Sequence, residues 1–165
     1  NWIQLKLDIV KPFLKTYFNT ISAGADRETY TFWEHLYANS PHKTHEEAWF
    51  LMETRWMLYL EEGSDLKLFN TIPREWMGDG NAIELSNVQS YFGSLSVNVK
   101  SSVNEGFIEA IIVCDSDRKP KSVTLRLPHP IGKKASRVTN GEYDPETETV
   151  LLNSFNGNEM IRVEY

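Results

Sequence analysis

The residues best suited to chemistry in this sequence are His42, His45 and Glu46, which lie just before a strongly apolar stretch. Histidine and carboxylate side chains bind metal ions, and at the start of a helix they also hydrogen-bond polar ligands beside free backbone N–H groups. The zinc-peptidase pattern needs two histidines four residues apart, whereas these two are three apart and no third ligand is evident. We therefore predict no metal and no cofactor. We expect these side chains either to contact a substrate or to belong to an ordinary surface loop.

The nearby glutamates do not form a catalytic pair. Hydrolysis of a glycosidic bond needs two carboxylates roughly 5 to 9.5 Å apart. Glu46 and Glu47 are neighbours in a predicted helix and point about 100° apart, whereas Glu46 and Glu53 share a face but stand roughly 10.5 Å apart along the axis. We expect Glu47 to form a capping box with Thr44, and Glu53 to be a buried carboxylate paired with Arg55 or with a neighbouring helix. The catalytic residues are therefore unknown.

Apolar periodicity predicts three helices in the first 62 residues. Apolar residues at steps of three and four predict the first helix over residues 12–22. Asp26 is a suitable N-cap for the second, over residues 26–38, which has a single apolar stripe. The third is expected over residues 44–62. Ten of the thirteen residues from 48 to 60 are apolar, so this helix lacks a single stripe and should have neighbours on all sides.

After Gly63 the hydrophobic period changes from 3.6 to 2, which indicates strands. Short apolar runs predict strands over residues 95–99, 107–114, 123–127, 150–152 and 160–165. Turn pairs typical of antiparallel hairpins occur at 79–80, 105–106, 140–141 and 156–157. Residues 71–76 predict one helical turn, with Pro73 at an early position. The predicted class is α+β, with a helical segment over residues 1–62 and an all-β antiparallel sandwich of about seven strands over residues 63–165.

Composition narrows the functional classes. A net charge of −6 over 165 residues argues against a nucleic-acid partner, which normally meets a basic face. Cys114 is the only cysteine, so neither an intrachain disulfide nor a cysteine metal site is expected. The sequence has no apolar run long enough to predict a membrane span, and no signal peptide. Because the chain starts at Asn1 without methionine, we expect a fragment or a processed product.

Aromatic residues suggest an alternative function. Tryptophan stacks on sugar rings, although at helical spacing it more often belongs to the core. A non-catalytic sandwich module with a helical N-terminal extension would bind carbohydrate or protein through Trp76, Tyr91, Phe92 or Tyr143. A further alternative is an α+β interaction domain whose helices form their own bundle.

Several segments resemble the C-terminal portion of six-hairpin, (α/α)6-barrel glycoside hydrolases with a terminal β-sandwich domain. They are HKTHEEAWF at 42–50, IPREWMGDG at 72–80 and FGSLS at 92–96. In that group similar segments close the helical toroid and open the β domain. The resemblance implies that residues 12–22 and 44–62 are inner helices and that residues 26–38 form an outer one.

The same resemblance implies a function for the chain. Residues 40–47 would form one wall of a sugar-binding cleft, with His42, His45 and Glu46 as substrate-binding residues, and the sandwich would brace the toroid. The implied partners are an oligo- or polysaccharide and the remainder of the parent polypeptide, or another chain, covering the helices. An extracellular or periplasmic location is implied as well. Most of the barrel is missing from this chain, so we expect the isolated chain to be inactive.

Overall fold

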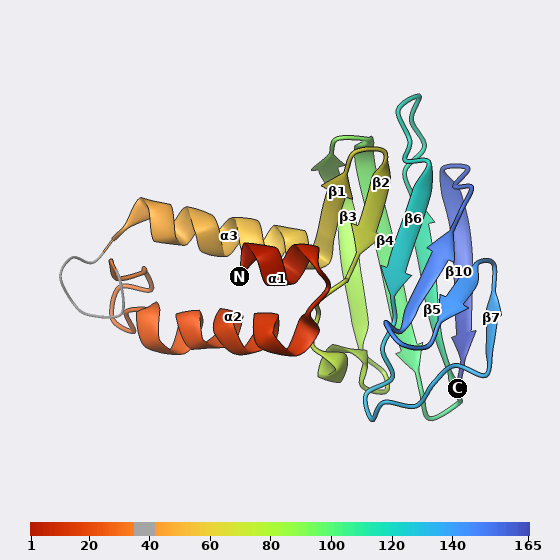
Figure 1. Cartoon of the computed structure of the whole chain (residues 1–165), viewed down its shortest axis with the longest axis horizontal. Helices are drawn as coiled ribbons and strands as arrows, with labels where there is room; N and C mark the ends of the chain where they lie inside the picture. The colour runs from red at the N-terminus through yellow and green to blue at the C-terminus, as the bar shows by residue number, and fades with distance from the viewer. Residues whose placement is uncertain (35–41) are drawn as a thin grey trace.

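The computed structural model describes residues 1–34 and 42–165. In this part of the chain a short helical region is followed by two five-stranded sheets that form a sandwich, and neither sheet closes into a barrel. Figure 1 shows helices α2 and α3 lying side by side and projecting from one end of the sandwich. The predicted α+β class is confirmed.

The helices of the described residues are α1, Trp2–Lys6; α2, Val10–Gly24; and α3, Thr44–Leu58. Helix α2 contains the predicted helix over residues 12–22 and begins before Pro12. A proline is compatible with this start because it lies in the first turn, where backbone N–H groups have no partner within the helix. Helices α2 and α3 meet at Tyr17, whose hydroxyl lies 2.7 Å from Thr54 Oγ1 and whose ring stacks on Phe50 with centroids 5.1 Å apart.

The predicted helix over residues 26–38 is wrong for its described part, which ends at residue 34, and the remainder lies outside the described residues. Asp26 does accept hydrogen bonds as an N-cap would, from the backbone N–H groups of Glu28 and Thr29 at 2.9 and 2.8 Å. The chain then turns back, because Tyr30 has a φ of 58° and a right-handed helix cannot continue through this conformation.

Helix α3 ends at Leu58 rather than near residue 62 and continues without a loop into strand β1, Tyr59–Glu62. The change occurs at Tyr59, whose φ and ψ of −152° and 130° are extended. The backbone carbonyl of Leu58 accepts a hydrogen bond from the N–H of Phe69 at 2.9 Å, and β1 then pairs with β2. The apolar run that predicted one long helix therefore supplies both a helix and a buried edge strand.

The two sheets have the strand orders β1-β2-β6-β9-β8 and β3-β4-β5-β10-β7. The remaining elements are β2, Asp65–Leu68; η1, Arg74–Met77; β3, Ala82–Ser90; β4, Gly93–Ser102; β5, Phe107–Val113; β6, Ser122–Arg126; β7, Arg137–Thr139; β8, Glu142–Asp144; β9, Thr149–Leu152; and β10, Asn158–Glu164. Strands β2 and β6 run parallel, so the predicted antiparallel arrangement is wrong at this pair. The parallel pairing is possible because strands β3, β4 and β5 of the other sheet intervene, and a parallel pair needs a long connection.

The five predicted strands are present as β4, β5, β6, β9 and β10, and the predicted helical turn after Pro73 is the short 3₁₀ helix η1. The sequence did not predict the other strands. Strands β7 and β8 have only three residues each, and β3 is polar and exposed along much of its length. Short or polar strands carry little period-two signal.

The predicted hairpin turn at residues 140–141 instead connects the two sheets, since β7 and β8 belong to different ones. Asn140 has a φ of 60° and Gly141 a φ of 118°. A Cβ atom at Gly141 would lie 2.5 Å from Val150 Cγ1, which real Cβ atoms do not tolerate. The position therefore requires glycine for both its conformation and its space.

Buried apolar side chains from the helices and from both sheets form one continuous core. Its largest fully buried members include Phe13, Met57, Leu66, Leu95, Ile112 and Leu125. Because Phe13 and Met57 belong to α2 and α3, the base of the helical pair is part of the sandwich core.

Substitution of the neighbouring residues Ile111 and Ile112 tests which face of β5 packs into the core. Ile112 is 0% exposed and Ile111 is 44% exposed. We expect Ile112→Ala to lower the free energy of unfolding by about 2–5 kcal/mol, because it leaves a cavity between the sheets. The matched control Ile111→Ala should cost less than about 1 kcal/mol. Urea unfolding measures both, and equal losses would contradict this assignment of faces.

Candidate functional site

The predicted substrate-binding residues lie at and just before the start of α3. His45 and Glu46 are in its first turn, with His45 Nε2 3.2 Å from Glu46 Oε1. His42 precedes the helix, is exposed and has a φ of 63°. The structure thus brings His45 and Glu46 together, while His42 is not paired with either in the described contacts. Residues 40–41 of the predicted cleft wall lie outside the described residues, and the binding role of the three side chains stays a prediction.

The predicted capping box at the start of α3 is wrong. The N-cap residue is Lys43, whose backbone carbonyl accepts from the N–H groups of Glu46 and Glu47 at 3.0 and 3.2 Å, with no side-chain cap. Thr44 is therefore already inside the helix, and the cap-to-third-residue spacing of a capping box is lost. Glu47 Oε1 is instead buried without a hydrogen-bond partner among the described residues.

Glu53 is buried, as predicted, and of the two predicted partners it is the neighbouring helix, here α1, rather than Arg55 that pairs with it. Glu53 Oε2 accepts a hydrogen bond of 2.9 Å from Nδ2 of Asn1, the residue before α1. Arg55 Nη2 pairs instead with Glu61 Oε1 at 2.7 Å, at the end of the helix. The burial of this carboxylate could be predicted from its apolar neighbours, whereas the partner depends on how α1 folds back.

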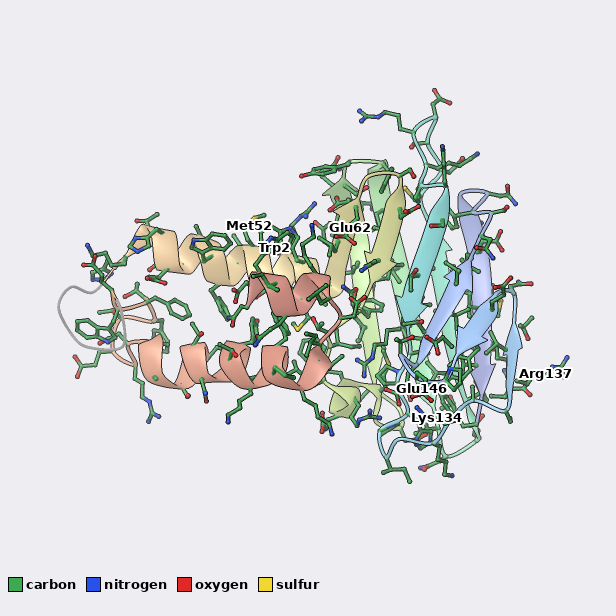
Figure 2. All side chains as sticks on the ribbon, viewed as in Figure 1. Trp2, Met52, Glu62, Lys134, Arg137 and Glu146 are labelled. Atoms are coloured by element: carbon green, nitrogen blue, oxygen red, sulfur yellow. The ribbon has the colours of Figure 1, made fainter. Side chains whose placement is uncertain are left out.

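Helix α3 carries apolar side chains on two opposite faces. The inward face contacts α2 through Phe50, and Met57 is buried at its base. The opposite face, here called the outer face of α3, consists of Ala48, Leu51 and Met52. Leu51 is 68% and Met52 is 37% exposed, and Figure 2 marks Met52 on this helix, apart from the sandwich. All three side chains are exposed, whereas Trp49 lies to one side of them and packs against Trp56, with ring centroids 6.1 Å apart.

The aromatic residues considered for a sugar-binding platform do not gather in one place. Trp76 and Tyr91 are exposed, but Trp76 precedes β3 and Tyr91 follows it. A strand of nine residues separates them by roughly 25 Å. Phe92 is buried, and Tyr143 is partly buried with its hydroxyl accepting from the N–H of Ala135 at 3.3 Å. These four side chains therefore do not form a common stacking surface.

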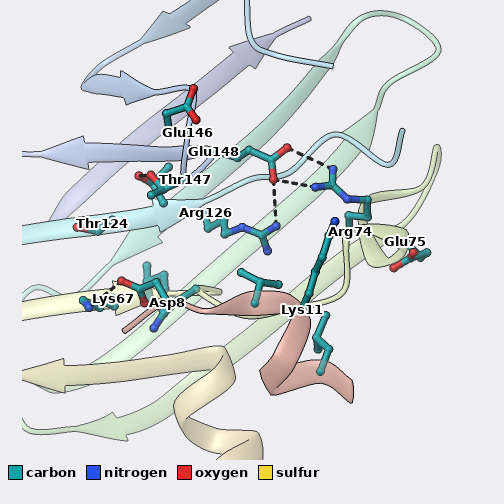
Figure 3. Close-up of a pocket in the computed structure, with 15 residues that line it drawn as sticks. Asp8, Lys11, Lys67, Arg74, Glu75, Thr124, Arg126, Glu146, Thr147 and Glu148 are labelled. Atoms are coloured by element: carbon teal, nitrogen blue, oxygen red, sulfur yellow. Dashed lines mark hydrogen bonds and ion pairs between the residues drawn. The ribbon is translucent and has the colours of Figure 1, made fainter. Parts of the chain in front are cut away.

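A cavity of about 430 Å³ lies between the start of α2 and the sheet that contains β2, β6 and β9 (Figure 3). Three charged residues from distant parts of the sequence form one wall. Arg126 is the last residue of β6, Glu148 directly precedes β9, and Arg74 is in η1. The cavity therefore lies where the helical pair joins the sandwich.

Glu148 holds both arginines of this wall. Its Oε2 atom lies 3.0 Å from Arg126 Nη2 and 3.0 Å from Arg74 Nη2. Arg126 Nη1 also donates to the carbonyl of Ile72 at 2.9 Å, and Arg74 Nη1 donates to the carbonyl of His129 at 2.6 Å. Burial lowers the pKa of Arg126, while the charge of Glu148 opposes this effect. The group ties β6, the residue before β9 and η1 to one another.

Sequence reasoning missed this cluster because its members are far apart in the chain. One local signal was available: Arg126 stands between Leu125 and Leu127 in a run that otherwise predicts a buried strand. A charged residue in such a run is seldom buried without a partner. The partners themselves, Arg74 and Glu148, leave no signal in the spacing.

Within the described residues, no group of three or more histidine, cysteine, aspartate or glutamate side chains is arranged to hold a metal ion. In the same part of the chain, no helix has the length and apolar character needed to cross a membrane. Comparison of the chain with protein-family models, with curated proteins and with solved structures finds no match.

The paired charges predict a large effect of neutralising Glu148. We expect Glu148→Gln to lower the free energy of unfolding by about 3 kcal/mol, because Arg126 would remain buried without a countercharge. The control Glu146→Gln changes an exposed carboxylate nearby and should stay within about 0.5 kcal/mol of the parent chain. Urea denaturation of both variants measures the difference. If the two variants were equally stable, Glu148 would not be the residue that compensates the buried charge of Arg126.

Proposed function

We propose that this chain is the C-terminal part of a carbohydrate-active glycoside hydrolase, in which α2 and α3 pack against further helices and the β-sandwich braces them. In this role the chain contributes one wall of a sugar-binding cleft and is not catalytic alone. The observation that carries the proposal is the outer face of α3, where apolar side chains at helical spacing are exposed.

This face supports the proposal because a helix that is apolar on opposite sides is normally buried on both. Leu51 follows Ala48 by three residues and Met52 follows it by four, the spacing of one helical face. Monomeric proteins rarely expose contiguous apolar patches of large area unless the patch binds something. A helix placed between two other helices needs two apolar faces, and this is the position that the resemblance to (α/α) barrels assigns to α3.

The position of His45 and Glu46 is consistent with a cleft shared with other helices. Helix α3 runs into β1 at its C-terminal end, so its first turn is the end farthest from the sandwich (Figure 1). Fifteen residues of helix span roughly 22 Å. In the proposed enzyme, His45 and Glu46 at that end would contact a ligand that is bound mainly by neighbouring helices. The same geometry agrees with a supporting rather than a catalytic role for this chain.

A dye-binding experiment tests the proposed packing role. We expect the isolated chain to bind anilinonaphthalene sulfonate and to self-associate at high concentration. Leu51→Glu should reduce both, because it places a charge within the outer face of α3, and it should change stability by no more than about 0.5 kcal/mol. The control Ile131→Glu alters an even more exposed apolar residue outside the helices and should change neither property.

Two results would contradict the proposal. A chain that stays monomeric at every concentration and binds no dye would contradict the packing role. Hydrolysis of aryl glycosides by the purified chain would contradict the assignment of catalysis to other helices.

A further inference from the structure

The loop that follows β6 places a buried histidine beside Arg74 and Glu148. His129 is only 5% exposed, whereas residues 131–134, which come directly after it, are exposed, with Ile131 at 78%. Histidine is the side chain whose ordinary pKa lies closest to physiological pH. Because His129 is the buried start of an exposed loop, its protonation state affects how that loop packs. Residues 128–133 are here called the 128–133 segment.

The contacts of the His129 side chain require a neutral ring. Its Nδ1 atom accepts a hydrogen bond of 3.2 Å from the backbone N–H of Ile131. A protonated imidazole carries a hydrogen on both nitrogens and has no acceptor left. The ring also meets Tyr165 edge to face, with centroids 4.8 Å apart, and the Tyr165 hydroxyl donates to the carbonyl of Leu127. Proton uptake by His129 therefore breaks the hydrogen bond that folds the 128–133 segment over its ring.

The backbone of His129 fastens the 128–133 segment to η1. The His129 carbonyl accepts hydrogen bonds from Arg74 Nη1 at 2.6 Å and from the N–H of Gly132 at 2.9 Å. Arg74 also donates to Glu148, from Nη1 at 3.2 Å and from Nη2 at 3.0 Å. If the segment opened, Glu148 would be the remaining partner of Arg74 among the described hydrogen bonds. The segment is therefore a second attachment of η1 to the sandwich.

The groups that face His129 oppose its protonation. They are Lys133 of the segment itself, Arg74 of η1, Glu148 before β9 and Tyr165 after β10. Burial lowers the pKa of His129, and the positive charges of Lys133 and Arg74 lower it further, whereas Glu148 raises it. Glu148 is already shared between two arginines, and burial raises the pKa of Tyr165, so this phenol stays neutral. The packed ring is therefore a weaker base than a histidine in solvent.

These contacts fix the direction of the response to pH. Above the ordinary histidine pKa of about 6.5, His129 is neutral whether the segment is packed or released, and the contacts persist. Below it, a released His129 binds a proton more readily than a packed one, so acid favours release, until the pH falls below the lowered pKa of the packed ring. We propose that the 128–133 segment is an acid-sensitive latch, held against η1 while His129 is neutral and released when His129 binds a proton. This inference does not rest on the proposed function.

Nuclear magnetic resonance of the full chain observes both the protonation and the release. We expect the His129 ring signals to titrate with a midpoint clearly below 6.5. Solvent exchange of the Ile131 and Gly132 amides, corrected for the intrinsic effect of pH, should show protection factors that fall by up to about tenfold per pH unit below 6.5. Amides of β4 and β5 should lose far less protection over the same range, because the latch opens locally.

Three variants separate the latch from general acid sensitivity. His129→Asn keeps an oxygen that accepts from the N–H two residues on but does not titrate, so protection of Ile131 and Gly132 should stay constant between pH 7 and 5. The matched control His42→Asn makes the same change at an exposed histidine and should keep the pH response of the parent chain. Lys133→Gln removes one opposing charge and should raise the midpoint of the His129 titration.

Three outcomes would overturn the inference. The first is a His129 midpoint at or above about 6.5 in the parent chain, a result that needs no variant to fold. The second is the same acid-induced loss of protection in His129→Asn as in the parent chain. The third is an equal loss in β4 and β5, which would indicate general acid unfolding. Each of these results would leave the packing role of the outer face of α3 untouched.

Discussion

Helix α3 is packed by α2 through Phe50 and by α1 through Trp56, and the described chain leaves its outer face exposed. Phe50 on the inward face meets Tyr17 of α2, and Met57 enters the core at the base. Leu51, on the outer face of α3, is left in solvent. Because α3 continues into β1 without a loop, the pairing of β1 with β2 also fixes the direction in which the helix leaves the sandwich. This geometry supports the proposed role, because α3 is joined directly to β1 and its exposed face lies outside the sandwich.

The joint between helices and sandwich contains a buried ion group beside its apolar core. Glu148 connects Arg126 of β6 with Arg74 of η1, and the start of α2 covers the cavity that these residues line. A buried ion group of this kind is not by itself evidence of stability, because desolvation offsets much of the attraction. Its position is more informative, because it ties β6, η1 and the residue before β9 to one another where the start of α2 meets the sandwich.

Much of the fold could be predicted because strong periodicity survives tertiary packing. The period-two runs gave β4, β5, β6, β9 and β10, and the three-and-four spacing gave α2. Prediction failed where one local signal fits two structures. Asp26 can cap a turn as well as a helix, and here it caps a turn. The apolar run through Tyr59 suits either a helix or a buried strand, and here it forms both. The cavity could not be predicted, since Asn70, Arg126 and Glu148 meet only through the sheet topology.

In the proposed account, an incompletely packed helical pair stands on a complete sandwich. Hydrogen–deuterium exchange of the isolated chain tests it most directly, because opening free energies report how well each element is packed. Backbone amides in the middle of α2 and α3 are expected to exchange through openings of much lower free energy than those of β4, β5 and β10. Equal protection of helices and central strands would contradict the claim and would indicate that the helices form a self-sufficient unit.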